Sequence, residues 1–378
     1  MLIASYIQKV WIQYNIIKVN FWISILFQTF LGLNLNVIYI ENNKVSKLGI
    51  AKGKIIIHHF ESSVLKFNPL KDPYNREIIV YIPPNYSQSQ SKGFPATFGL
   101  SGFGGNGRTF FNLDPLSENI EERMNRLISE NKCGPMILVI PDCFTKFGGN
   151  QYINSTATGR YEDYIVNELI PFIQNNYNIS SFGLWGKSSG GYGSLVLGMR
   201  YPEIFKAIAC HSGDAAFEYC YIPDFPSAYT SFKEAGGIKN WFDQFWNKAN
   251  KKQKKDFVAL NILGMAAHYS PDSTSQLGVK LPFDIETGEL IDEIWKMWKK
   301  WDPINMINYY QDNLKKLNCL YIDCGIKDEF NLYIGARIIH QKLENMNIKH
   351  HYEEFDGGHS NTSFRYDTSF PILYSALS

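Results

Sequence analysis

The sequence predicts an α/β fold with a mostly parallel central sheet and helices on both faces. Three observations carry this prediction. Short apolar runs alternate with amphipathic helical segments along most of the chain, as in doubly covered parallel sheets. Residues 136–140 form a continuous apolar run, which is typical of a strand buried on both faces. A glycine-serine turn at 186–190 lies between one such run and a helix of small residues.

The expected strands follow one another at intervals that leave room for helical connections. Residues 77–82 are stopped by two prolines, and the run 95–100 ends in a glycine-rich loop. The last two runs lie close to the C-terminus. The complete set of expected strands is 54–60, 77–82, 95–100, 136–140, 182–185, 207–210, 319–324 and 350–355.

Helical periodicity separates these runs. Tyr161, Ile165, Leu169 and Phe172 recur at spacings of three and four, which predicts an amphipathic helix over 161–177. A second helix is expected near 332–343. Both helices would cover a face of the sheet.

The interval from 212 to 318 is too long for one crossover between strands. We expect it to hold an aromatic-rich cap insertion at about 215–305. Most of its rings would pack inward, with one or two facing a pocket, which would favour an aromatic or bulky partner. The interval carries five tryptophans: Trp241, Trp246, Trp295, Trp298 and Trp301.

Composition is that of a folded globular protein, with 45% hydrophobic and 19% charged residues. The formal net charge of +1 gives no broad field for nucleic acid or for an acidic membrane surface. The lysine-rich stretch 248–255 reads as a solvated face. The six cysteines form no CxxC pair and no zinc-ligand spacing, so reduced thiols in a cytoplasmic protein are expected, although an even number of cysteines also permits disulfides. We expect the protein to need neither a metal nor a cofactor.

The first fifty residues are interpreted as an N-terminal extension, and residues 51–378 as the catalytic domain. Residues 21–33 are apolar but too few for an unassisted membrane span. The alternatives are a signal or anchor within residues 1–35, which would make the protein secreted or membrane-attached, and a poorly ordered segment. Oligomeric state is not determined by the sequence.

The turn Gly186-Lys187-Ser188-Ser189-Gly190 fits G-x-S-x-G, the strand-to-helix nucleophile elbow. Such a turn raises a serine hydroxyl above the carboxyl edge of the sheet, where a histidine from another loop can reach it. The flanking glycines are needed because the turn leaves no space for side chains. Ser188 is therefore the candidate nucleophile, and a passive glycine-rich turn is the structural alternative.

A serine hydroxyl needs a base to take its proton and an acid to orient that base. His359 follows the last strand and two glycines, and Asp328 follows the strand 319–324, which matches the order Ser, Asp, His. His211 remains as an alternative base. Asp214 remains as an alternative acid, behind Asp328.

Two other carboxylates are less suited to the acid role. Asp323 lies within a strand and would be buried below the site, and Asp356 is too close in sequence to His359 to reach behind its ring. Acyl transfer also needs two preset N–H donors for the oxyanion. We expect the backbone N–H groups of Ser189 and Phe103, the latter from the glycine-rich loop 101–105 after a central strand.

These motifs resemble those of the putative-esterase family of α/β-hydrolases, which includes S-formylglutathione hydrolases (esterase D), feruloyl and enterochelin esterases and antigen 85 mycolyltransferases. The resemblance covers residues 54–378 and includes the segments 158–171 and 81–86. It implies an α/β-hydrolase fold with Ser188, His359 and Asp328 as the triad. The family often has His-Gly where this chain has Ser101-Gly102, and the cap is longer than in compact members.

The sequence thus predicts a serine esterase that hydrolyses small carboxylic esters through an acyl-enzyme. Three alternatives remain open. An acyltransferase would use the same triad with a second alcohol in place of water, and a peptidase would act on amides. A non-catalytic binding protein with the hydrolase fold would have no need of all three triad residues.

Overall fold

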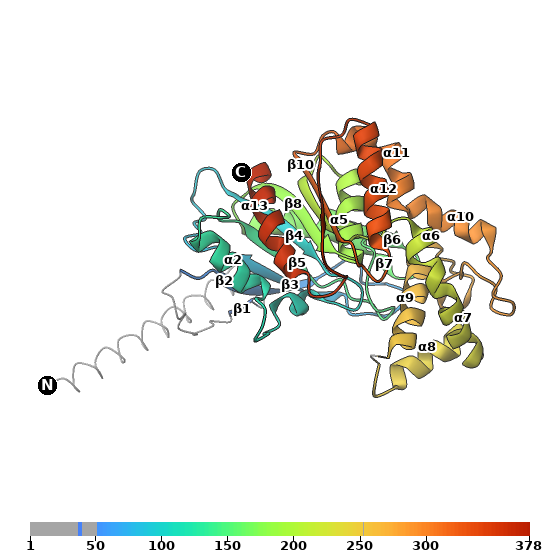
Figure 1. Cartoon of the computed structure of the whole chain (residues 1–378). Helices are drawn as coiled ribbons and strands as arrows, with labels where there is room; N and C mark the ends of the chain where they lie inside the picture. Colours follow the sequence, from blue (N-terminus) through green and yellow to red (C-terminus); the bar gives the residue numbers. More distant parts are fainter. Residues whose placement is uncertain (1–36, 40–50, 252) are drawn as a thin grey trace, which may run out of the picture. The chain divides into compact units, whose positions relative to one another are not determined.

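A computed structural model describes residues 37–39, 51–251 and 253–378 (Figure 1). The predicted signal or anchor at 1–35 lies outside these residues, as does most of the N-terminal extension. Strand β1 is Val37–Tyr39. Among the described residues, none of the helices combines the length and apolarity that crossing a membrane would require.

A mixed sheet forms the centre of the chain from residue 54 onward. Its strand order from β2 is β2-β3-β5-β4-β8-β9-β10-β11. β3 runs antiparallel to both its neighbours, and all pairings from β5 to β11 are parallel. The prediction of a mostly parallel sheet is therefore confirmed. The strands are β2 (Lys54–Glu61), β3 (Asn75–Ile82), β4 (Phe94–Leu100), β5 (Ile137–Pro141), β8 (Ile179–Lys187), β9 (Phe205–His211), β10 (Cys319–Gly325) and β11 (His351–Phe355).

Side chains of alternate residues in these strands enter two separate cores. In β5, Ile137 and Val139 belong to one apolar cluster, and Leu138 and Ile140 belong to the other. The smaller cluster is closed by α2 (Ile120–Ser129) and α13 (Tyr366–Leu377). The larger one is closed by helices that include α5 (Ser189–Arg200) and α12 (Leu332–Asn345). Burial on both faces explains why the strands read as continuous apolar runs.

The helix expected over 161–177 is present but not uniform. It begins as α3 (Tyr161–Asp163), widens into a π-helical segment at Tyr164–Leu169, and ends as α4 (Ile170–Asn176). The predicted apolar face is fully buried at Tyr161, Ile165 and Leu169. A small hairpin, β6 (Asn154–Ser155) and β7 (Gly159–Arg160), precedes it. Short helical turns complete the elements: Gly107–Phe111 and Ser363–Arg365.

The long interval between β9 and β10 is helical, as a cap insertion requires. Figure 1 shows α7, α8 and α9 grouped beyond one end of the sheet. Its last helix, α11 (Pro303–Leu314), returns to pack on α5. The preceding elements are α6 (Phe217–Cys220), η3 (Ile222–Asp224), α7 (Phe225–Glu234), α8 (Ile238–Asn247), α9 (Lys254–Tyr269), η4 (Gln276–Gly278) and α10 (Asp292–Trp301).

One buried carboxylate joins the two ends of this insertion. Asp302 Oδ1 accepts hydrogen bonds from the backbone N–H of Ala216 (2.9 Å) and of Ile304 (3.1 Å), and Oδ2 accepts one from Phe217 N–H (2.7 Å). Burial raises the pKa of Asp302 to about 6. The side chain therefore caps α11 and fixes the start of α6 at the same time.

Replacing Asp302 removes three acceptor contacts at a fully buried position. We expect Asp302→Ala to lower the free energy of unfolding by about 3 kcal/mol, since buried N–H groups lose a charged acceptor. Urea unfolding followed by circular dichroism measures this change. Asp302→Asn keeps one side-chain oxygen as an acceptor, so its free energy of unfolding should fall by a smaller amount. Equal stability of wild type and Asp302→Ala would show that the clamp contributes nothing.

Candidate active site

The turn between β8 and α5 holds Ser188 in a backbone conformation that side chains rarely adopt, with φ 58° and ψ −128°. The Ser188 N–H donates to the carbonyl of His211 (3.0 Å), which ties the turn to the end of β9. A Cβ on Gly190 would lie 1.9 Å from the Leu100 carbonyl oxygen. Glycine is therefore required where α5 passes against the end of β4.

His359 and Asp328 meet on the loops that follow β11 and β10. His359 Nδ1 lies 2.7 Å from Asp328 Oδ2, and the carboxylate is buried. Asp328 Oδ1 accepts from Phe330 N–H (2.9 Å), and the Phe330 ring packs edge-on against the imidazole. Because Nδ1–H donates to Asp328, Nε2 carries the lone pair that a general base needs.

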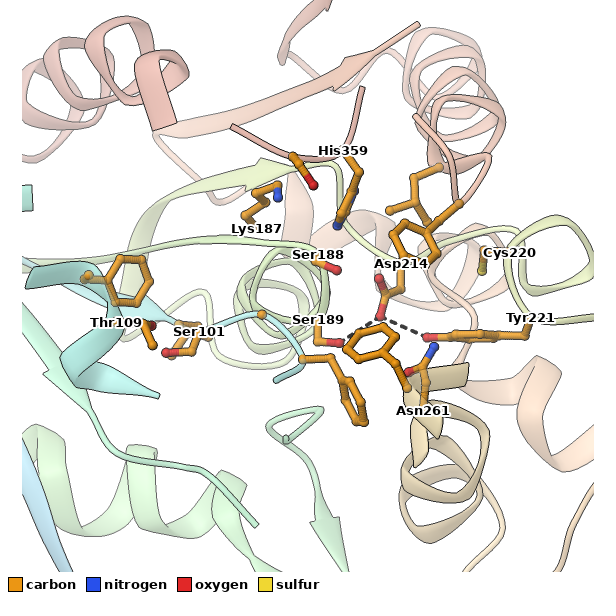
Figure 2. A pocket seen from close by; sticks show the side chains of 18 of the residues that line it. Ser101, Thr109, Lys187, Ser188, Ser189, Asp214, Cys220, Tyr221, Asn261 and His359 are labelled. Carbon is orange, nitrogen blue, oxygen red and sulfur yellow. Dashed lines mark hydrogen bonds between the residues drawn. The ribbon is translucent and has the colours of Figure 1, made fainter. Parts of the chain in front are cut away.

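Ser188 and His359 line one cavity of about 350 Å³. Figure 2 shows the imidazole above Ser188, with a ring nitrogen directed toward it. Among the described residues, no hydrogen bond joins Ser188 Oγ to the His359 ring, although both side chains line the same cavity. The lining residues comprise Leu100, Ser101, Gly102, Phe103, Thr109, Phe110, Lys187, Ser188, Ser189, Asp214, Cys220, Tyr221, Phe257, Asn261, Phe330, Leu332, His359, Ser360 and Tyr366.

The two backbone donors predicted for an oxyanion also reach this cavity. Ser189 is the first residue of α5, where an N–H has no acceptor within the helix. Phe103 lies on the loop after β4, and neither its N–H nor that of Ser189 has an acceptor among the described residues. Both residues line the cavity beside Ser188. The helix dipole of α5 adds a favourable field for a negative charge there.

The structure contradicts His211 as an alternative base. Its Nδ1 lies 2.8 Å from Asp323 Oδ1 and its Nε2 lies 3.0 Å from Ser369 Oγ. All three side chains are buried and none lines the cavity. Asp323 also accepts from Arg365, and its pKa is lowered by the nearby His211 and Arg365 despite burial. This second Ser–His–Asp chain is therefore inaccessible to substrate and sits beneath the elbow.

The two remaining carboxylates take different positions. Asp214 lines the cavity but bonds to Tyr221 and Ser189 rather than to the His359 ring, so it is not the acid that orients His359 in this structure. Asp356 is exposed and pairs with Lys327 (2.5 Å). Its lack of contact with the imidazole agrees with the expectation from its sequence position.

The expectation that one or two cap tryptophans face the pocket is wrong for the cavity that holds Ser188. Trp241, Trp295 and Trp298 are buried in the core of the cap. Trp298 packs edge-on against Tyr221, one layer behind the cavity wall. The large size of the indole favours core positions, and smaller aromatic rings take the wall instead. The aromatic residues in the wall are Phe103, Phe110, Phe257, Phe330, Tyr221 and Tyr366.

Sequence reasoning missed three polar residues in the cavity wall. Tyr221 and Asn261 belong to the cap, and no motif marks them. Lys187 occupies the second position of the elbow motif, where any residue is allowed. Burial lowers the pKa of Lys187, and its ammonium has no ion-pair partner among the described residues. Only the folding of the cap over the elbow brings these groups together.

All six cysteines lie within the described residues, and each is a buried free thiol. Burial raises the pKa of Cys143, Cys210 and Cys324. They therefore behave as small apolar side chains, as the sequence predicts.

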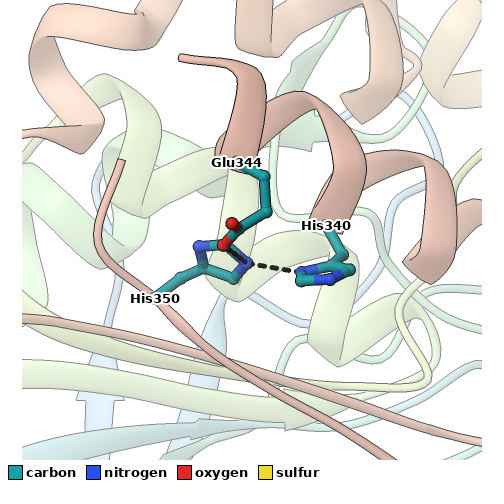
Figure 3. A group of neighbouring side chains, drawn as sticks. All are labelled: His340, Glu344 and His350. Carbon is teal, nitrogen blue, oxygen red and sulfur yellow. Dashed lines mark hydrogen bonds and ion pairs between the residues drawn. The ribbon is translucent and has the colours of Figure 1, made fainter. Parts of the chain in front are cut away.

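A second group of polar side chains lies on α12 and directly before β11 (Figure 3). His340, Glu344 and His350 place one potential metal-ligand atom each within 4.8 Å of one another. His350 Nδ1 donates to the carbonyl of Ile348, which leaves Nε2 to accept from His340 Nδ1 at 2.8 Å. His340 also stacks on Tyr352. In this arrangement one imidazole donates a hydrogen bond to the other and joins α12 to the segment before β11.

The sheet order, the elbow and the His359–Asp328 pair define an α/β-hydrolase with the features of a serine esterase. The family model described as Putative esterase matches residues 73–369. Because this match covers most of the chain, the protein belongs to that family of ester hydrolases.

A curated relative, the uncharacterized protein YbbA of Bacillus subtilis, is 31% identical over 159 residues. That match spans 38% of this chain and 59% of YbbA. The shared part therefore falls well short of either full length.

Solved structures of similar fold include three hydrolases. A ferulic acid esterase matches with a TM-score of 0.55 at 17% identity over 86% of this chain and 99% of that one. FphF, a fluorophosphonate-binding serine hydrolase of Staphylococcus aureus, matches with a TM-score of 0.53 at 15% identity over 86% of this chain and 99% of FphF. An S-formylglutathione hydrolase of Agrobacterium tumefaciens matches with a TM-score of 0.53 at 15% identity over 90% of this chain and 100% of that one. At these identities the likeness shows the fold alone.

Backbone strain at Ser188 should make the stability of the protein depend on which residue replaces the serine. Glycine adopts φ 58°, ψ −128° without the clash of a Cβ, whereas alanine keeps that clash. We expect Ser188→Gly to be more stable than Ser188→Ala by about 1 kcal/mol, because relief of strain exceeds the entropy that glycine loses. Thermal unfolding of the two variants compares them directly. A less stable Ser188→Gly would show that the turn stores no strain.

Proposed function

We propose that this protein hydrolyses carboxylic esters with Ser188 as nucleophile, His359 as general base and Asp328 as the acid that orients His359. The observation that carries the proposal is the His359–Asp328 hydrogen bond of 2.7 Å in the cavity that also holds Ser188. The N–H groups of Ser189 and Phe103 would receive the developing oxyanion.

The reaction follows from these positions. His359 Nε2 takes the Ser188 hydroxyl proton while Ser188 Oγ forms a bond to the ester carbonyl carbon. The carbonyl oxygen gains negative charge and is held by the two N–H groups. When the tetrahedral intermediate collapses, the ester C–O bond breaks and His359 gives its proton to the leaving alcohol. Water then repeats the sequence on the acyl-enzyme, releasing the carboxylic acid and restoring Ser188.

Asp328 contributes by holding one ring nitrogen of His359 as a donor. Its negative charge stabilises the imidazolium that forms during attack, and its hydrogen bond fixes the ring orientation. Burial of the carboxylate limits screening by water, which strengthens this interaction.

Two alternatives use the same site. An acyltransferase would give the acyl-enzyme to a second alcohol, so the product formed in mixtures of water and alcohol distinguishes it from a hydrolase. A peptidase would cleave amides, so the ratio of amide to ester turnover distinguishes it. The substrate classes named for the structural neighbours, a ferulate ester and S-formylglutathione, are the first candidates to test.

The nucleophile is tested with Ser188→Ala and the matched control Ser369→Ala. Both serines lie near a histidine, but Ser369 is buried with His211, away from the cavity. We expect Ser188→Ala to lower kcat on p-nitrophenyl esters by about 10⁶-fold and to abolish labelling by a fluorophosphonate. Ser369→Ala should still be labelled. Labelling of Ser188→Ala, or turnover equal to wild type, would disprove the assignment.

The orienting acid is tested with Asp328→Asn. An amide at this position favours the wrong tautomer of His359, so we expect kcat to fall by about 10⁴-fold. Asp356→Asn is the matched control, because that carboxylate is close in sequence to His359 but exposed and paired with Lys327. Initial rates on one p-nitrophenyl ester measure both variants. A loss of activity in Asp356→Asn but not in Asp328→Asn would show that Asp328 is not the orienting acid.

A further inference from the structure

One wall of the cavity is built around the carboxylate of Asp214, on the loop after β9. Its Oδ2 accepts hydrogen bonds from Tyr221 OH (2.9 Å), Ser189 Oγ (3.1 Å) and Gln151 Nε2 (3.4 Å). The donors come from separate parts of the chain, and all are buried. The orientation of the carboxylate is therefore fixed before any substrate binds.

The second oxygen of this carboxylate is unused. Asp214 Oδ1 has no hydrogen-bond donor among the described residues. It is not among the buried polar atoms that lack both a partner and contact with solvent, so solvent can reach it. Figure 2 shows the carboxylate reaching into the cavity between Ser188 and Tyr221, with only one oxygen bonded to the residues drawn. Oδ1 is thus a free acceptor directed into the space beside the nucleophile.

A second buried polar group faces the same space. Asn261, on α9, lines the cavity with 8% of its surface exposed. Its amide has no hydrogen-bond partner among the described residues, and Figure 2 places it below Tyr221, on the same side of the cavity as Asp214. An amide offers both a donor and an acceptor. Neither side chain is among the polar groups sealed from solvent without a partner, so water or a polar ligand in the cavity can reach both.

The charge balance at this wall also favours a ligand with a donor. Asp214 forms no ion pair with a lysine or arginine among the described residues, and its three partners are neutral. Burial raises the pKa of Asp214, although the hydrogen bond from Tyr221 and the nearby His359 oppose this shift. A hydroxyl suits both groups, since it can donate to Asp214 Oδ1 and accept from the Asn261 amide.

We propose that Asp214 and Asn261 form a specificity subsite that binds a hydroxyl group on the substrate, so that hydroxylated esters are the preferred substrate class. This inference rests on the proposed ester hydrolysis at Ser188. The subsite adjoins the nucleophile, which places the recognised hydroxyl a few bonds from the scissile carbonyl. A methyl group in that position would displace water from Asp214 and Asn261 without replacing its hydrogen bonds.

The test uses two pairs of esters that differ by hydroxyl against methyl. p-Nitrophenyl β-hydroxybutyrate and p-nitrophenyl isovalerate vary the acyl part, and hydroxyethyl butyrate and propyl butyrate vary the alcohol part. For wild type we expect kcat/KM to favour the hydroxylated member of one pair by about 100-fold, as for a lost hydrogen bond to a charged group. The pair that responds identifies which part of the ester carries the hydroxyl.

Substitutions test whether Asp214 and Asn261 cause the preference for hydroxylated esters. Asp214→Ala and Asn261→Ala should each reduce the ratio toward one. Phe257→Leu is the matched control, because Phe257 lies one turn before Asn261 on α9 and lines the same cavity without a polar group. The ratio should survive in this control. If Asp214→Ala does not fold, the kcat/KM ratios of wild type and of Asn261→Ala still test the proposed subsite.

Two failures can be told apart. Wild type that is labelled by a fluorophosphonate at Ser188 and hydrolyses both members of each pair equally would overturn the subsite alone. A preference that persists in Asp214→Ala and Asn261→Ala would do the same. Wild type that is neither labelled nor active on any of the four esters would overturn the proposed function, and the subsite with it.

Discussion

The whole site depends on the close approach of the first turn of α5 to the end of β4. At Gly190 the chain passes so near the Leu100 carbonyl that a single Cβ would overlap it. This contact fixes the angle between β8 and α5, which holds Ser188 in its strained conformation. The same turn is held from the other side by the hydrogen bond from Ser188 N–H to the His211 carbonyl. Both the hydroxyl and the adjacent N–H donors inherit their positions from these backbone contacts.

The chain contains two hydrogen-bonded histidine–aspartate pairs, and burial gives them different roles. His211 and Asp323 lie inside the sheet edge, and Ser369 and Arg365 complete a closed polar network there. His359 and Asp328 lie one layer above, where Nε2 faces the cavity. The lower pair uses its hydrogen bonds to hold the ends of β9 and β10 together. We assign catalysis to the upper pair, because among the described residues His359 lines the cavity that holds Ser188 and His211 does not.

The cap supplies part of the cavity wall. Asp302 joins the beginning of the insertion to its end, so the start of α6 and the start of α11 are held together by a buried carboxylate. The tryptophans fill the interior of the cap and support Tyr221 from behind. The wall itself is made of phenyl rings with the free groups of Asp214 and Asn261 among them. A scaffold shared with many esterases can therefore carry its own substrate preference in a few cap residues.

The sequence by itself determined the strands of a mostly parallel sheet, the elbow around Ser188, and the loops that hold His359 and Asp328, because apolar runs and glycine turns are local signals. It favoured His359 as the base but left His211 as an alternative, which was removed only by the contact of His211 with Asp323, 112 residues away in the chain. It placed tryptophans at the pocket, where the fold puts smaller rings. The polar wall of Asp214, Tyr221 and Asn261 was decided by tertiary structure alone, because no local pattern records which side chains a cap brings over a sheet.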